Sequence, residues 1–139
     1  MEVAILVSLA LAVFGLVITS LAADPNKDSG YIAKGQVVYS QFCVSCHSAN
    51  GKGSGINSAG QKSAPPDLTS ISQKYKGFPT AKIMNWIDGQ RVESSGREMP
   101  IWGQRFRTAG GSDVQAFGNI YALTKYLESI QNVSQAAQK

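Results

Sequence analysis

The chain has 139 residues, enough for one domain and too few for two sizeable hydrophobic cores. With 43% apolar and 16% charged residues, its composition excludes wholesale disorder. The formal net charge of +4 comes from scattered lysines and arginines with no run of five, so no nucleic-acid partner is indicated. Two cysteines and one histidine exclude a four-cysteine zinc site and any site built from two imidazoles.

The amino-terminal segment, residues 1–23, is apolar and carries no charge from Val3 to Ala23. As a helix, that uncharged stretch would be about 31 Å long, close to the thickness of a bilayer core. Its length favours an uncleaved transmembrane helix, whereas the small residues at Ser20 and Ala22 leave a cleaved signal peptide open. Both interpretations place the rest of the chain on the periplasmic, extracytoplasmic side of the cytoplasmic membrane. Residues 24–30 are polar and contain proline and glycine, which predicts a linker.

Apolar spacing after the linker predicts short helices and no strands, so we expect an all-α domain at 31–131. The first helix is expected at 31–42, where small and apolar residues share one face. The last is expected to begin at the capping-box pair Ser112 and Gln115 and to reach Ile130. The apolar pattern is lost from Gln131 on, and residues 132–139 are predicted to be a frayed polar tail.

Two further helical stretches are expected in the middle of the domain. One follows Pro65–Pro66 and runs to Tyr75, and the other covers 80–87, with Thr80 as its cap and Gly89 at its end. The segments 48–64 and 90–111 are long, poor in apolar residues and predicted to be irregular. Because three to five short helices cannot close a core around such loops, we expect a large apolar cofactor to fill the centre.

Residues 43–47 read Cys-Val-Ser-Cys-His, the C-x-x-C-H spacing of covalent haem c attachment. Two thiols one turn apart can form thioethers with the haem vinyl groups, and the adjacent His47 can ligate the iron. Rival interpretations of Cys43 and Cys46 are a thioredoxin-like dithiol, a zinc site and a structural disulfide. The first needs a β-α-β context, the second needs a fourth ligand, and the third leaves His47 unexplained.

The second ligand of the iron is expected to be a methionine, because the chain has no second histidine. Met1 lies at the membrane end, and Met84 lies on a helix face where core packing explains it. Met99 precedes Pro100 in an irregular segment, and a proline holds the residue before it extended. We therefore expect His47 and Met99 to bind the iron, with an open site or a small-molecule ligand as the alternative.

The order and spacing of these residues over 31–131 resemble the class I mono-haem c-type cytochromes. The resemblance implies a fold of short helices around one covalent haem. It also implies that Gly35 and Tyr39 of the first helix pack across the last helix. The residues expected to meet them there are Leu123, Tyr126 and Leu127.

The resemblance also implies roles for residues around the haem. The family has a proline after the haem motif whose carbonyl accepts from the axial histidine, matched here by Pro66, with Pro65 as a rival. Met99–Pro100 with Trp102 resembles the methionine loop of the family. Candidates for contacting the haem propionates or covering the haem edge are Trp86, Trp102, Arg91 and Arg97.

A haem with both axial positions filled exchanges one electron and has no vacant position for a substrate, which predicts an electron-transfer protein rather than an enzyme. The resemblance implies a quinol-oxidising complex or a dehydrogenase as electron donor and a terminal oxidase or similar protein as acceptor. With a membrane helix, the chain would be a tethered carrier or a fixed subunit of a respiratory-type complex. The alternatives are a peroxidase-like enzyme or gas sensor with a labile methionine, and a non-haem C-x-x-C redox module.

Overall fold

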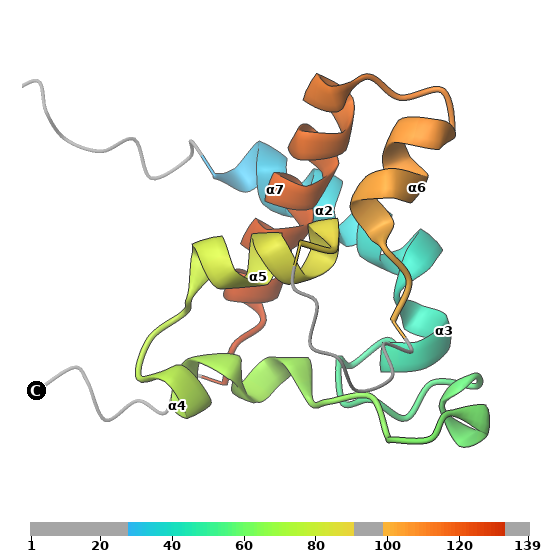
Figure 1. The fold of residues 1–139 in the computed structure, drawn as a ribbon. Helices are drawn as coiled ribbons and strands as arrows, with labels where there is room; N and C mark the ends of the chain where they lie inside the picture. The colour runs from blue at the N-terminus through green and yellow to red at the C-terminus, as the bar shows by residue number, and fades with distance from the viewer. Residues whose placement is uncertain (1–27, 91–98, 133–139) are drawn as a thin grey trace, which may run out of the picture.

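A computed structural model describes residues 28–90 and 99–132, and Figure 1 shows its ribbon. The elements in chain order are α2 (Ser29–Phe42), α3 (Val44–His47), η2 (Ser58–Gly60), η3 (Leu68–Ser70), α4 (Ile71–Tyr75), α5 (Thr80–Asp88), α6 (Trp102–Thr108) and α7 (Asp113–Ser129). The two η elements are single turns of 3-10 helix. No strand occurs in the described ranges, in agreement with the expected all-α fold.

Several sequence predictions fall on residues outside the described ranges. They are the apolar segment 1–23, most of the linker, Arg91 and Arg97, and the tail beyond Asn132. None of the helices that the structure describes is long and apolar enough to cross a membrane. The expected linker at 24–30 is too long by two residues, because α2 already begins at Ser29.

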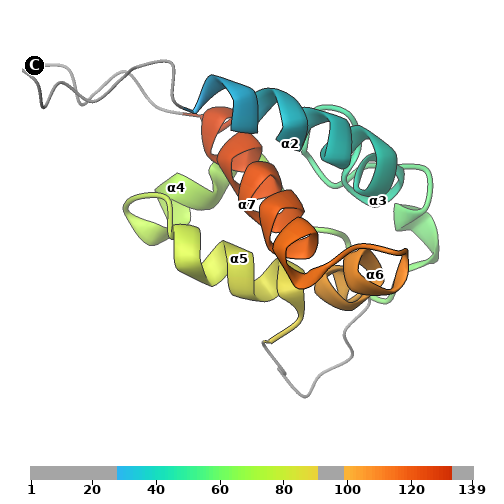
Figure 2. The ribbon, with the colours of Figure 1, turned by 90° about the horizontal axis from the view of Figure 1, so that it is seen from above.

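Helices α2 and α7 cross in close contact and form one side of the hydrophobic core (Figure 2). At the crossing, a Cβ on Gly35 would overlap the backbone carbonyl of Ala122, so only glycine permits this approach. Next to it, the rings of Tyr39 and Tyr126 lie 5.2 Å apart. Leu123 and Leu127 are also buried in this core. The packing expected for Gly35 and Tyr39 is therefore confirmed.

Both ends of α7 are fixed by side-chain hydrogen bonds. At the start, the Ser112 hydroxyl accepts from the Gln115 amide, and the Gln115 side chain accepts from the Ser112 amide, which confirms the capping box. Past the end, Gln131 is buried, and the backbone amide of Asn132 donates to the Thr69 carbonyl at 2.8 Å. Polar bonds therefore hold Gln131 and Asn132 in place although the apolar pattern ends there, and the rest of the expected tail, 133–139, lies outside the described residues.

Helices α5 and α6 differ from the sequence expectation in two ways. Thr80 does not cap α5, since Pro79 precedes the helix and no side chain caps it, whereas Gly89 ends it as expected with a φ of 96°. The segment 90–111 is not irregular throughout, because α6 lies inside it. Helix α6 is too short to show a helical period in the sequence. It is stabilised by a tertiary contact, because Phe106 is buried in the core.

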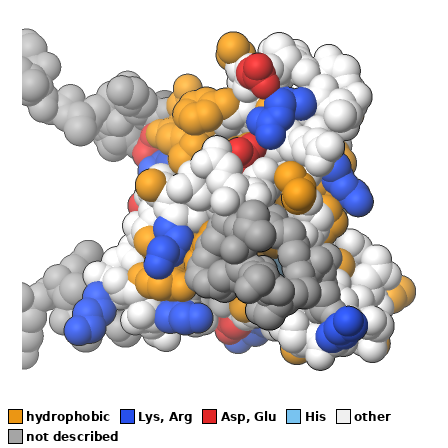
Figure 3. Space-filling model, in the orientation of Figure 1, with side chains coloured by type: hydrophobic (Ala, Val, Ile, Leu, Met, Phe, Trp, Pro, Cys, Tyr) orange, Lys and Arg blue, Asp and Glu red, His pale blue; other side chains and the backbone are white. Residues whose placement is uncertain are grey.

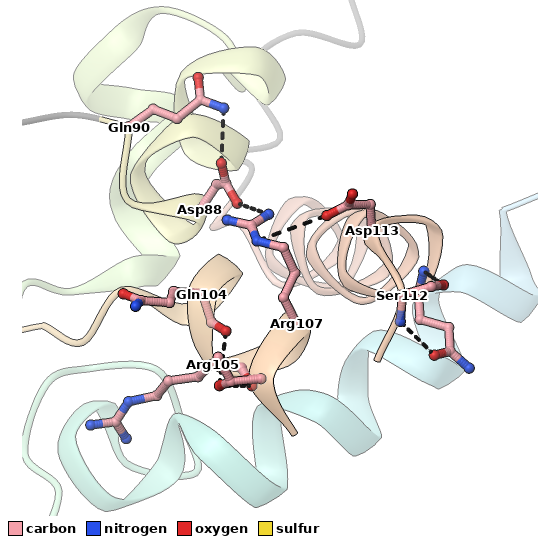
Figure 4. Close-up of polar contacts among 9 residues, drawn as sticks. Asp88, Gln90, Gln104, Arg105, Arg107, Ser112 and Asp113 are labelled. Carbon is pink, nitrogen blue, oxygen red and sulfur yellow. Dashed lines mark hydrogen bonds and ion pairs between the residues drawn. The ribbon is translucent and has the colours of Figure 1, made fainter. Parts of the chain in front are cut away.

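Asp88 joins α5 to α6 through the contacts drawn in Figure 4. Its carboxylate accepts from the Gln90 amide at 2.8 Å and from the Arg107 guanidinium at 3.2 Å. The Arg107 guanidinium also lies 4.0 Å from the Asp113 carboxylate at the start of α7. A side chain on Gly103 would overlap the Asp88 carboxylate, so α6 approaches α5 closely. This network holds together the two helices that flank the segment containing Met99.

Candidate functional site

A cavity of about 520 Å³ lies between α2 and α3 on one side and η3, α4, α5 and the start of α6 on the other. Its apolar side chains come from α2, η3, α4, α5, the start of α6 and α7, and α3 contributes Cys46 and His47. The apolar side chains include Tyr39, Phe42, Leu68, Ile71, Tyr75, Ile83, Trp86, Ile87, Trp102, Leu123 and Leu127. The helices thus enclose a large apolar space, as the long loops between short helices had led us to expect.

The five site residues expected from sequence all line this cavity: Cys43, Cys46, His47, Pro66 and Met99. They come from three separate segments of the chain, and the fold brings them together. The tryptophans named as candidates for the haem edge, Trp86 and Trp102, line the same cavity. Met84 instead packs against the hydrophobic core and is absent from the cavity lining.

The C-x-x-C-H motif lies where α2 ends and α3 begins. The backbone amide of Cys43 donates to the Tyr39 carbonyl at 2.9 Å, and the amide of His47 donates to the Cys43 carbonyl at 2.8 Å. No disulfide joins Cys43 and Cys46. Burial, with a smaller contribution from Cys46, raises the pKa of the Cys43 thiol to about 12. The attacking thiol of a reactive dithiol has a lowered pKa, so the burial of Cys43 does not favour it as the attacking thiol of a thioredoxin-like pair.

His47 presents a neutral imidazole to the cavity. Burial lowers the pKa of His47 below its ordinary value, and the backbone carbonyl of Pro66 offsets part of this effect. Nδ1 of the ring is buried and has no hydrogen bond of good geometry. Both observations fit a Pro66 carbonyl that lies near Nδ1 without full alignment. The neutral ring is the form that ligates a metal, and the carbonyl is the kind of partner that fixes its tautomer.

The loop after the motif is bonded to α3, a feature that the sequence analysis missed. The amides of Gly53, Gly55 and Asn57 donate in turn to the carbonyls of His47, Cys46 and Ser45, at 2.8–3.0 Å. Gly53 has a φ of 77°, and a Cβ there would overlap the Pro65 carbonyl. In the sequence, the alternating glycines at 51, 53 and 55 are the feature that could have indicated this loop. This loop fixes the haem motif against the segment that carries Pro66.

A cytochrome c family model matches residues 32–131, well over half of the chain. The chain belongs to the cytochrome c family. Searches of the curated proteins and of the solved structures found no significant match. Members of this family carry haem c bound covalently, so covalent haem c is the cofactor of this cytochrome, and its general function is haem-based electron transfer.

The cavity of this cytochrome fits that cofactor. It offers two cysteines at C-x-x-C spacing that no disulfide joins, an imidazole whose Nδ1 is buried beside the Pro66 carbonyl, and a lining that is mostly apolar. A cationic side chain lies near its rim, because the Arg105 guanidinium is 5.2 Å from the ring centre of Trp102. Sequence reasoning had named Arg91 and Arg97 for such a role and had not considered Arg105.

Proposed function

We propose that this cytochrome is a one-electron carrier in which His47 and Met99 ligate the haem iron. The observation that carries the proposal is that His47 and Met99 both line the one cavity that holds the C-x-x-C-H motif, whereas Met84 does not. When bound, the haem supplies an iron that cycles between two oxidation states one electron apart. With an imidazole and a thioether as ligands, no coordination position remains for a substrate.

The other residues of the cavity bind and orient the group. Cys43 and Cys46 hold it through thioether bonds, and Pro66 orients the imidazole of His47. Leu123 and Leu127 of α7 close the inner wall with apolar side chains that exclude water. A low-dielectric surrounding of this kind favours the less charged, reduced state of the site.

We further propose that residues 1–23 remain as a membrane helix and hold the haem domain on the periplasmic side. The length of the uncharged segment supports this assignment. The donor would be a quinol-oxidising complex or a dehydrogenase and the acceptor a terminal oxidase or similar protein, with the chain as tethered carrier or as fixed subunit. The net charge of +4 favours partners with an acidic docking face.

The ligand assignment is tested by comparing Met99→Ala with Met84→Ala. An iron-bound methionine places its methyl group over the haem ring, which shifts that methyl signal far upfield in the NMR spectrum of the reduced protein. We expect Met99→Ala to lose this signal and to have a lower reduction potential, and Met84→Ala to keep both. An unchanged signal and potential in Met99→Ala would overturn the assignment.

A further inference from the structure

Four side chains form an apolar surface on the outside of the molecule, which we call the aromatic patch: Tyr31 of α2 with Val114, Phe117 and Tyr121 of α7. Tyr31 is 43% exposed, Val114 80% and Phe117 62%. The ring of Tyr121 joins the others, 4.9 Å from the ring of Tyr31 and 6.4 Å from that of Phe117. Figure 3 shows hydrophobic side chains gathered beside the start of α2. A contiguous exposed apolar surface of this kind marks an interaction site.

The aromatic patch is separate from the haem site. None of its four residues lines the cavity. Tyr31 lies in the first turn of α2, whereas Cys43 directly follows the last residue of that helix. A helix of 14 residues is about 21 Å long, so Tyr31 and the C-x-x-C-H motif lie near opposite ends of α2. Figure 1 shows these two ends, with α3 following the end that carries the motif. Contact at the patch therefore leaves the haem end of the domain free.

The chain outside the described ranges determines what can reach the patch. Only residues 24–28 separate the end of the apolar segment from the start of α2 at Ser29. Five residues span at most about 18 Å even when fully extended. With residues 1–23 in a bilayer, the start of α2 must lie within that distance of the membrane surface.

The composition of the patch and its surroundings fits a membrane surface. Tyrosine and other aromatic rings are favoured at the boundary between lipid and water, because their apolar body and polar tip match the two sides. Charged groups of both signs flank the patch. The Lys125 ammonium lies 2.8 Å from the Asp28 carboxylate and 2.7 Å from the Glu128 carboxylate, and the Lys34 ammonium lies beside Gly118 of α7. Two ammonium groups thus offset two carboxylates, which leaves little net charge to oppose insertion among lipid headgroups.

We propose that the aromatic patch docks on the lipid headgroup region of the membrane that holds residues 1–23. The docked domain then has one fixed orientation, with the C-x-x-C-H end of α2 directed away from the bilayer. This inference rests on the proposed retention of residues 1–23 as a membrane helix. A second copy of the chain and another membrane subunit are the competing occupants.

The test uses the full-length holoprotein in vesicles of phosphatidylcholine and phosphatidylglycerol. A spin label is attached through Val114→Cys in the patch and, as a control, through Ser54→Cys in the loop next to the haem motif, where the side chain is exposed. Collisions with oxygen, which concentrates in lipid, are compared with collisions with a water-soluble nickel chelate. We expect a several-fold higher oxygen-to-nickel ratio at position 114 than at position 54.

A matched pair of charge variants shows that the patch itself makes the contact. Phe117→Glu places a carboxylate in the patch, and Ile56→Glu places one on an apolar side chain outside it that is 88% exposed. We expect Phe117→Glu to bring the ratio at position 114 down to that at position 54, and Ile56→Glu to leave it unchanged. Both variants should keep the wild-type haem spectrum.

Three results would overturn the docking. They are equal ratios at positions 114 and 54, dipolar broadening between labels at position 114 that reports a second copy, and equal effects of the two charge variants. An alkaline carbonate wash of the same vesicles tests the membrane helix separately. Protein that resists the wash while position 114 stays exposed to water contradicts the docking alone, whereas protein that washes off contradicts the membrane helix.

Discussion

The side-chain amide of Gln131 donates a hydrogen bond to the backbone carbonyl of Leu68, with 2.7 Å between nitrogen and oxygen. The same nitrogen donates to the Leu127 carbonyl, and the side-chain oxygen accepts from the backbone amide of Ser72. Leu68 begins η3, two residues after Pro66. Gln131 thus ties the end of α7 to the segment that positions Pro66 against the imidazole of His47.

Replacing Gln131 by Leu should lower the free energy of unfolding by about 2 kcal/mol, because it removes one buried hydrogen bond to the Leu127 carbonyl and two partly buried ones, to Leu68 and Ser72. The control is Gln73→Leu, since Gln73 is exposed and donates one long bond of 3.5 Å to Asn132. This control should change stability by about 0.5 kcal/mol or less. Denaturant unfolding of the two holoproteins measures both values, and equal losses would contradict the role given to Gln131.

Gly35 and Gly30 offer a second matched pair in α2. A Cβ on Gly35 would overlap the carbonyl of Ala122, whereas a Cβ on Gly30 would meet nothing within 4 Å. Gly35→Ala should therefore cost about 2 kcal/mol by forcing α2 and α7 apart. Gly30→Ala should leave stability unchanged or raise it, because alanine favours the helix over glycine. A Gly35→Ala protein as stable as Gly30→Ala would show that the helices do not meet at this glycine.

Gly53 should be the sensitive position in the loop that supports the haem motif. Gly53→Ala forces a side chain into the left-handed region and against the Pro65 carbonyl. We expect a loss of about 2 kcal/mol in the unfolding free energy of the holoprotein. Gly60→Ala is the control, because a Cβ there meets nothing within 4 Å and the backbone φ is ordinary. Thermal unfolding monitored at the haem band measures the midpoints of both variants. Similar midpoints for Gly53→Ala and Gly60→Ala would show that this loop does not stabilise the haem motif.

Asp88 and Asp113 both face Arg107, with very different exposure. The Asp88 side chain is 16% exposed and also holds Gln90, whereas the Asp113 side chain is 91% exposed and lies 4.0 Å from the guanidinium. Asp88→Ala should lower stability by about 1 kcal/mol, and Asp113→Ala should have almost no effect. The loss should shrink in high salt. Unfolding at two salt concentrations checks both statements, and a larger loss for Asp113→Ala would be inconsistent with the network.

Features encoded by adjacent residues could be predicted from the sequence. The C-x-x-C-H motif needs only five consecutive residues, and the capping box of Ser112 and Gln115 needs four. The packing of Gly35 against the last helix could be predicted because its spacing from Cys43 resembles that of a known family. Met99 could be singled out because the chain has only three methionines, of which one begins the apolar segment and another lies on the apolar face of a helix. Each of these features depends on residues close together in the sequence, or on a residue type that occurs only a few times in the chain.

Features that depend on tertiary contacts could not be predicted. Helix α6 has seven residues and only Gly103 and Phe106 buried, so its sequence shows no helical period. Gln131 is polar and is nevertheless buried, because its partners lie 59 and 63 positions away. The loop after His47 is held by backbone amides, which every residue in it can supply, so only its glycines distinguished it. A sequence pattern shows the type and spacing of side chains. These features depend instead on backbone hydrogen bonds and on contacts between residues far apart in the chain.

The most direct test of the central claim is to expose the reduced wild-type holoprotein to carbon monoxide and record its absorption spectrum. If His47 and Met99 occupy both axial positions, the iron has no free site, and the spectrum should remain that of the reduced protein. Rapid conversion to a carbon monoxide complex would show that the sixth position is open or weakly held. That result would contradict the electron-carrier account and favour the peroxidase-like enzyme or gas sensor.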